Sequence, residues 1–177
     1  AADLDHDGDL DLVFANLEGP NTVAWNQGGM TFTMQRLDHG RSRGVAVLDA
    51  DGNGRLDLVF TQGLGSISRF ELMDLNADGS GRFERRTLPG VLTPAYAMAW
   101  ADIDGDGDLD LATASYDTLL SKAQGPGFLS GTGAGIMLYE NLDGRFHGTK
   151  LADSSQALAV TFFDVNHDGL PDLLVGN

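Results

Sequence analysis

Four stretches of this sequence carry oxygen-bearing side chains at the spacing that a calcium ion requires. Each stretch reads D-x-[DN]-x-[DN]-G-x-x-D, with glycine always at position 6. Calcium takes about six to eight oxygen ligands at ~2.3–2.6 Å, and a tight loop supplies them when side chains at positions 1, 3 and 5 turn inward and position 7 offers its backbone carbonyl. The glycine permits the sharp bend, with a positive φ expected. The copies are residues 3–11, 49–57, 102–110 and 164–172.

We predict up to four bound Ca²⁺ ions, one in each loop. The position-9 carboxylate must close each site, because position 12, where an EF-hand places its bidentate glutamate, holds Phe14, Phe60, Thr113 and Val175. The predicted ligands are Asp3, Asp5, Asp7, Asp9 and Asp11 in the first loop; Asp49, Asp51, Asn53, Arg55 and Asp57 in the second; Asp102, Asp104, Asp106, Asp108 and Asp110 in the third; and Asp164, Asn166, Asp168, Leu170 and Asp172 in the fourth. Those that would bind through the backbone carbonyl are Asp9, Arg55, Asp108 and Leu170.

Strands, rather than the paired helices of an EF-hand, must position these loops. A short apolar run such as Leu12-Val13-Phe14 follows each position 9, as is typical of a buried strand. The loops recur about every 50 residues, and four β-rich runs separated by turn signals fit into one period, which predicts the all-β blades of a β-propeller. The predicted strands are 10–15, 22–26, 30–37, 44–48, 56–61, 67–74, 82–88, 95–101, 109–115, 135–140, 145–151, 157–163 and 171–175.

The chain is predicted to be one propeller segment of about three blade equivalents. Residues 1–42 would form a partial blade, 43–90 and 94–152 two full blades of four antiparallel strands, and 153–177 a further partial blade. A ring of seven blades needs roughly 350 residues at about 50 per blade. We therefore expect a truncated or processed segment of a larger six- to eight-bladed ring, whose other blades lie in the same chain or in an oligomer. A curved, unclosed array is the third possibility.

Recurring phrases around the loops resemble those of the FG-GAP/VCBS repeat family. They are Trp25 to Gly29, Asp78 to Phe83 and Tyr139 to Phe146, and with the four loops the resemblance covers essentially the whole chain. This family includes many bacterial secreted and surface proteins, integrin α-subunit propellers and some propeller lectins. The resemblance implies a propeller, often seven-bladed, with Ca²⁺ in the loop between the first two strands of a blade. The Phe-Gly and Gly-Ala-Pro dipeptides of the integrin version are missing, which favours the bacterial secreted type.

Composition narrows the partners and the cellular setting. The formal net charge of −15 argues against nucleic acid or an anionic lipid surface as a partner. No apolar run approaches the ~18 residues of a membrane helix, so membrane insertion is not expected. Cysteine is absent, so disulfides cannot stabilise the fold. Several calcium-dependent loops favour an extracellular or cell-surface location, because calcium is plentiful there.

Catalysis has little support in the sequence. There is no G-x-S-x-G elbow, no H-E-x-x-H and no cysteine nucleophile, and the concentrated carboxylates are assigned to metal. We predict that the chain is not an enzyme but a calcium-stabilised extracellular module for adhesion, scaffolding, or carbohydrate or protein binding. The alternative is an accessory propeller of a secreted polysaccharide-degrading enzyme. The long third-repeat connection, residues 117–134, would be a binding loop on the face opposite the calcium loops, or equally a tolerated insertion.

Several other features are expected to be structural. His6 and His167 fall at position 4 of their loops, which points to solvent. Residues 74–79 begin like a fifth calcium loop, but position 9 is basic, so we predict a plain turn. Trp25 and Trp100 are expected to pack between blades rather than to stack on a ligand.

Overall fold

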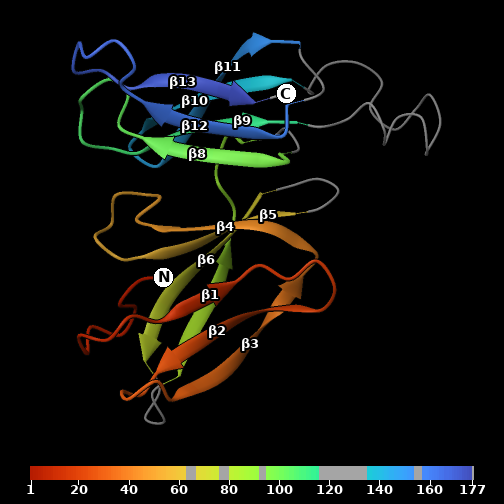
Figure 1. Cartoon of the computed structure of the whole chain (residues 1–177), viewed down its shortest axis with the longest axis vertical. Helices are drawn as coiled ribbons and strands as arrows, with labels where there is room; N and C mark the ends of the chain where they lie inside the picture. Colours follow the sequence, from red (N-terminus) through yellow and green to blue (C-terminus); the bar gives the residue numbers. More distant parts are fainter. Residues whose placement is uncertain (63–66, 76–79, 92–94, 116–134, 154–156, 177) are drawn as a thin grey trace, which may run out of the picture. The chain divides into compact units, whose positions relative to one another are not determined.

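The computed structural model describes residues 1–62, 67–75, 80–91, 95–115, 135–153 and 157–176 (Figure 1). Every regular element in these residues is a β-strand, and the sheets are antiparallel, which confirms the predicted all-β fold. Each predicted strand has a counterpart within a few residues. The predicted binding connection, 117–134, lies outside the described residues, as do positions 76–79 of the predicted turn.

Two antiparallel sheets make up the first compact unit, which contains essentially β1 to β7. The first sheet has three strands in the order β1-β2-β3, and the second has four in the order β4-β5-β6-β7, so neighbours in the chain are neighbours in the sheet (Figure 1). The strands are β1 (Leu12–Phe14), β2 (Pro20–Asn26), β3 (Phe32–Gly40), β4 (Ser42–Leu48), β5 (Asp57–Gln62), β6 (Ile67–Leu75) and β7 (Gly81–Arg86).

The second compact unit contains β8 to β13. Four strands again follow chain order across one sheet, and the last two form a separate antiparallel pair in register from Ala159↔Gly176 to Phe163↔Asp172. The strands are β8 (Ala97–Ala101), β9 (Asp110–Ala114), β10 (Ile136–Leu142), β11 (Arg145–Ala152), β12 (Ala159–Phe163) and β13 (Asp172–Gly176). In the described residues no helix has the length and apolarity needed to cross a membrane.

Alternating side chains build the core of the first unit. Val23 and Trp25 on β2, and Leu58 and Phe60 on β5, are spaced two residues apart and are fully buried in one cluster, as the period of a strand requires. The Trp25 ring stacks on Phe83 of β7 with 6.1 Å between ring centroids. The packing role predicted for Trp25 is therefore confirmed.

A side-chain amide ties the two sheets of the first unit together. Gln35 on β3 accepts a hydrogen bond from Nε1 of Trp25 at 2.8 Å, and the same Oε1 atom accepts one from the backbone N–H of Gly81 on β7 at 3.0 Å. The indole N–H thus has a partner inside the core, as a buried tryptophan requires.

One core cluster of the second unit is built mainly from small side chains. Ala114, Ile136, Ala157 and Val160 are buried together, and Leu173 and Val175 of β13 pack against them. On the same unit, Trp100 of β8 meets Phe146 of β11 edge to face with 5.9 Å between centroids. β9 and β13 begin at Asp110 and Asp172, which are the closing aspartates of the third and fourth loops.

Candidate metal centres

The position-1 aspartate closes each acidic loop by accepting two backbone N–H groups. In the first loop, Asp3 accepts from Asp7 at 3.1 Å through Oδ1 and from Gly8 at 3.1 Å through Oδ2. The same pattern recurs for Asp49 with Asn53 and Gly54 and for Asp164 with Asp168 and Gly169, whereas Asp102 accepts from Gly105, one residue earlier than in the other loops, and from Gly107. The four loops therefore share one backbone framework.

The position-9 aspartate ties the end of each loop to its beginning. Asp11 Oδ2 accepts a hydrogen bond from the backbone N–H of Leu4 at 2.9 Å. The equivalent bonds run from Ala50 to Asp57 at 3.1 Å, from Ile103 to Asp110 at 2.9 Å and from Val165 to Asp172 at 3.0 Å. Asp11, Asp57 and Asp110 are buried where their strands begin.

The position-5 side chains shape the second half of each loop. Oδ1 of each accepts a hydrogen bond from the backbone N–H two residues later, at 2.8 or 2.9 Å; the acceptors are Asp7, Asn53, Asp106 and Asp168. Such a local turn holds the backbone between positions 5 and 7 in a bend. A carboxylate retains further lone pairs for a metal ion.

Three loops bring their position-1, position-3 and position-9 carboxylates together. The ligand oxygens of each triad lie within 4.8 Å of one another. Two oxygens ~2.3–2.6 Å from one ion can be at most roughly 5 Å apart, so each triad fits a single cation of calcium's size. The triads are Asp3, Asp5 and Asp11; Asp49, Asp51 and Asp57; and Asp102, Asp104 and Asp110.

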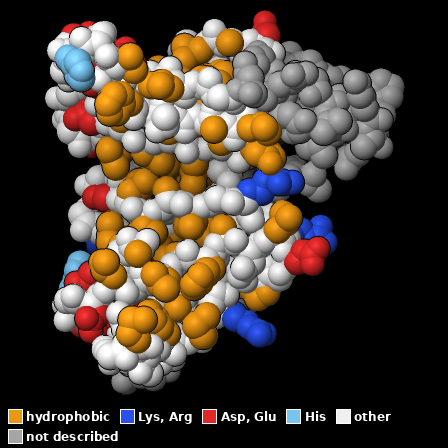
Figure 2. Space-filling view, viewed as in Figure 1, with side chains coloured by type: hydrophobic (Ala, Val, Ile, Leu, Met, Phe, Trp, Pro, Cys, Tyr) orange, Lys and Arg blue, Asp and Glu red, His pale blue; other side chains and the backbone are white. Residues whose placement is uncertain are grey.

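The fourth loop differs because Asn166 stands at position 3. It keeps the same framework, and Asn166 Oδ1 accepts the N–H of Asp168 at 2.8 Å, but an amide oxygen replaces one carboxylate. For all four loops, the complete ligand sets given above, including the position-7 carbonyls, stay a prediction. In the space-filling view, acidic side chains and a histidine gather at one edge of each unit (Figure 2).

Burial and crowding raise the pKa of two of these carboxyl groups. Burial is the largest cause for Asp5, followed by the negative charges of Asp11 and Asp7. Burial also raises the pKa of Asp110, with a further contribution from neighbouring carboxylates, while hydrogen bonds from the N–H groups of Asn141 and Ile103 partly oppose the shift. A cation in either triad would relieve this repulsion.

We expect calcium affinity to fall as the solution is acidified. The raised pKa of Asp5 and Asp110 means that protons compete for these oxygens at a higher pH than for an ordinary aspartate, and calcium requires the deprotonated form. Calorimetric titrations with calcium should show weaker binding at about pH 5 than at about pH 7, and protons should be released on binding at the lower pH. Magnesium is the comparison ion. Equal affinity and no proton release at the two values would contradict this expectation.

Position 4 of every loop adopts the left-handed backbone conformation. The predicted positive φ at the position-6 glycines is confirmed, with values from 81° at Gly54 to 99° at Gly107. Position 4 was not anticipated: φ is 60° at His6 and 63° at His167, and glycine fills this position in the other two loops. The two histidines are exposed, in agreement with the predicted solvent-facing role.

Replacing His6 or His167 by glycine should stabilise the protein. A non-glycine residue in this conformation costs roughly 1–2 kcal/mol, and glycine loses roughly 0.5–1 kcal/mol more backbone entropy on folding. The expected net gain is about 0.5 kcal/mol in urea denaturation. Gly52→Ala, at the same position of the second loop, is the matched control and should lower stability by about 1 kcal/mol. A loss of stability on His6→Gly would contradict the strain argument.

Two asparagines support the loops from the second strand of their repeats. The backbone N–H of Asn141 donates to Asp110 Oδ1 at 2.8 Å, its Nδ2 donates to the carbonyl of Leu109 at 3.2 Å, and its Oδ1 accepts from Gly144 at 2.9 Å. Asn26 makes the equivalent bonds to Asp11, Leu10 and Gly28. The sequence signal for this supporting role is the asparagine that recurs in the phrases around Trp25 and Tyr139.

The second loop contacts a basic side chain instead. Nη1 of Arg69, on β6, lies 2.6 Å from Oδ2 of Asp51 and 3.2 Å from Oδ2 of Asp57. Arg69 is only 6% exposed. The loop motif does not predict this contact, because Arg69 lies in a strand outside the nine-residue phrase.

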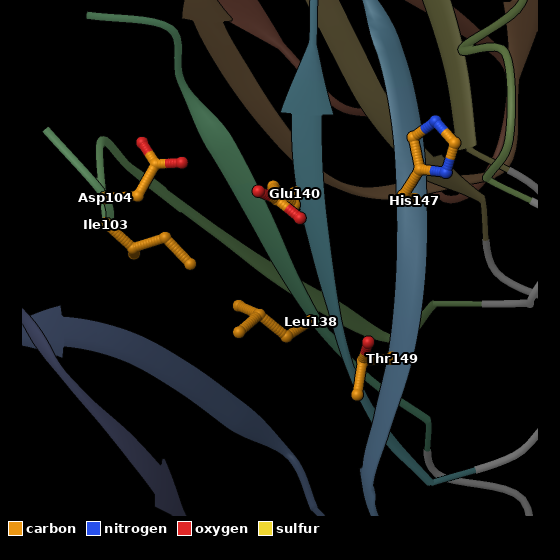
Figure 3. Close-up of a pocket in the computed structure, with 6 residues that line it drawn as sticks. All are labelled: Ile103, Asp104, Leu138, Glu140, His147 and Thr149. Carbon is orange, nitrogen blue, oxygen red and sulfur yellow. The ribbon is translucent and has the colours of Figure 1, made fainter. Parts of the chain in front are cut away.

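A shallow hollow lies beside the third loop. It has a volume of about 240 Å³ and is lined by Ile103 and Asp104 from the loop, by Leu138 and Glu140 from β10, and by His147 and Thr149 from β11 (Figure 3). The β-strand residues meet as cross-strand pairs, Leu138 with Thr149 and Glu140 with His147. The hollow shares Asp104 with the acidic triad and therefore belongs to the surroundings of that loop.

The fold and the loops together define an all-β repeat protein whose repeats each carry an acidic loop at the entrance to a strand. The chain belongs to the FG-GAP-like repeat family, whose pattern matches residues 3–60 and 49–113. Each match starts at position 1 of one loop and runs through the next loop into its strand, which confirms the resemblance inferred from the sequence.

One curated relative gives a more distant similarity. The chain is 29% identical over 109 residues to cartilage acidic protein 1 of Mus musculus. The alignment covers 57% of this chain and 17% of the relative, so the chain spans only a small part of that protein.

Proposed function

We propose that the chain is a non-catalytic, calcium-stabilised β-propeller segment that acts outside the cell as a binding, adhesion or scaffold module. The observation that carries this proposal is the carboxylate triad repeated in three loops, in each of which the position-6 glycine N–H donates to the position-1 aspartate. Repetition of one site at the same point in successive repeats favours a structural role, because a catalytic centre needs only one copy.

The chemistry of the donors favours calcium. Every predicted side-chain ligand presents oxygen, with neither thiolate nor imidazole among them, which suits a hard cation. Loops of this kind can supply the six or more oxygens that calcium takes without rigid geometry, whereas magnesium demands a near-ideal octahedron at ~2.0–2.1 Å. When bound, calcium would neutralise the crowded carboxylates and join the two ends of each loop.

The sheets are proposed to be successive blades, with the bounds predicted from the sequence. Large apolar side chains remain exposed on the sheets at the two ends of the series: Phe14 and Met34 on the first, and Phe163 and Leu174 on the last, with exposed fractions between 41% and 61%. Further blades, in the same chain or in an oligomer, would cover such surfaces. This supports a larger ring.

An extracellular or cell-surface location is supported by the predicted calcium loops and by the similarity to a relative named for cartilage. The ligand of this chain would be a protein or a glycan, since the chain's net charge of −15 disfavours nucleic acid. The absence of catalytic chemistry is supported by the use of the buried carboxylates in loop hydrogen bonds and triads.

Calorimetric titration of chelator-treated protein with CaCl₂ tests the proposal. We expect saturable binding with dissociation constants between about 10⁻⁶ and 10⁻³ M, the range of sensor and extracellular sites. Asp3→Asn should remove calcium binding by the first loop and leave binding by the third. Asp102→Asn should do the reverse. Magnesium at the same concentration should bind far more weakly. No binding at about 10 mM calcium would refute the calcium assignment.

A further inference from the structure

The second loop differs from the others because the protein supplies a cation to it. Arg69 projects from β6 and is almost fully buried. One of its terminal nitrogens bridges Asp51 and Asp57, which are positions 3 and 9 of the loop and two of the three carboxylates of its triad. The guanidinium therefore contacts two of the carboxylates that a bound metal ion would contact.

The geometry makes the guanidinium a competitor for the same oxygens. The bridging nitrogen is 2.6 and 3.2 Å from the two Oδ2 atoms, against ~2.3–2.6 Å for a calcium–oxygen bond. In the first and third loops the position-9 carboxylate accepts uncharged backbone N–H groups, from Leu4 and Asn26 and from Ile103 and Asn141 respectively. Among the residues that the structure describes, the positive charge that contacts a closing aspartate is that of Arg69, on Asp57 of the second loop.

The charge of the ligands also predicts weaker calcium binding by the second loop. The side chains at positions 1, 3, 5 and 9 are four carboxylates in the first and third loops, but in the second loop Asn53 replaces one of them. Arg69 offsets a further negative charge. Calcium affinity rises with the number of charged ligands, and a fixed positive charge beside the site repels the ion.

We propose that Arg69 is the resident counter-cation of the second loop, which it closes without metal and makes a weaker calcium site than the first and third loops. This inference rests on the proposed calcium binding of those two loops. It divides the repeats into metal-dependent loops and one loop held by an internal ion pair. Within the first unit, the chain would thus keep one loop ordered when calcium is scarce.

Hydrogen–deuterium exchange read by mass spectrometry tests the proposal, because peptides covering 3–11, 49–57 and 102–110 report each loop separately. In chelator, wild-type 49–57 should exchange more slowly than the other two loops. On calcium titration, protection of 3–11 and 102–110 should reach its midpoint at a calcium concentration at least about tenfold below that of 49–57.

Arg69→Met removes the cation and keeps much of the buried volume. We expect 49–57 to exchange faster in chelator and its calcium midpoint to move about tenfold lower. Arg86→Met is the matched control, because Arg86 pairs opposite Arg69 in the sheet but forms an exposed ion pair with Glu84 at 2.9 Å. It should leave the exchange of all three loops as in the wild type.

The outcomes separate this inference from the proposed function. A wild-type calcium midpoint for 49–57 equal to or below that of 3–11 overturns the role of Arg69, whether or not the variant folds. An unchanged midpoint in a folded Arg69→Met protein overturns it as well. If 3–11 and 102–110 gain no protection from calcium, the proposed calcium function fails instead, while slow exchange of 49–57 in chelator would still support closure by Arg69.

Discussion

Excess chelator is expected to lower the melting temperature of this protein by more than about 10 °C. A site that binds only the folded state adds about 2.7 kcal/mol when calcium exceeds the dissociation constant ~100-fold. Two such sites, in the first and third loops, would add about 5 kcal/mol, and 1 kcal/mol corresponds to roughly 2–4 °C for a chain of this size. Removal also leaves the carboxylates of each triad without a compensating charge; burial, and after it the charges of Asp11 and Asp7, already raise the pKa of Asp5.

Thermal unfolding followed by circular dichroism, with metal content verified in each sample, is the measurement. Each compact unit contains two of the four loops, so both should melt at lower temperature if they unfold separately. Restoring calcium should recover the original curve, and restoring magnesium should recover little of it. An unchanged melting curve after verified calcium removal would refute the structural role of the metal.

The strands and loops could be predicted because their causes are local. A run such as Leu12-Val13-Phe14 directly after an aspartate identifies a strand entrance, and β1 begins at Leu12. The glycine at position 6 has a positive φ for a reason visible in the motif, since the chain must turn sharply there. Repetition strengthens both inferences, because the same loop occurs in four copies.

The partners of the loops could not be predicted, because they depend on strand register. Arg69 reaches Asp51 and Asp57 only because β6 lies next to β5 in the sheet, and nothing in its local sequence fixes that placement. The strained backbone conformation of His6 could not be predicted for a different reason. A ligand pattern describes the side chains that bind the ion and says little about a residue that points to solvent.

The loops share a backbone framework but carry different charges, so they should not behave as four equal sites. The first and third loops present four carboxylates at the side-chain ligand positions, the fourth presents three with Asn166, and the second is offset by Arg69. If affinity follows ligand charge, calcium should bind most tightly in the first and third loops, less tightly in the fourth, and least tightly in the second. The first and third loops combine full charge with equivalent support from an asparagine of their own sheet, Asn26 and Asn141 respectively.

Asp110→Ala should therefore be among the most damaging single substitutions in this protein. Asp110 is 1% exposed, and its two oxygens accept the N–H groups of Asn141 at 2.8 Å and Ile103 at 2.9 Å. Alanine would leave both donors without this acceptor, at about 1–3 kcal/mol each, and would remove the carboxylate that closes the site. We expect a loss of about 3–5 kcal/mol in the presence of calcium, which is roughly 6–20 °C in melting temperature.

Asp108→Ala is the matched control for this substitution. It removes an aspartate two residues away, yet it preserves the backbone carbonyl through which position 7 would bind calcium. We expect less than about 1 kcal/mol from the control, because surface substitutions away from buried polar networks have small effects. Urea denaturation with and without calcium separates the two contributions: the orphaned N–H groups cost stability in both conditions, whereas the lost ligand costs stability only with calcium. Equal effects of the two variants would mean that Asp110 does not close the third loop.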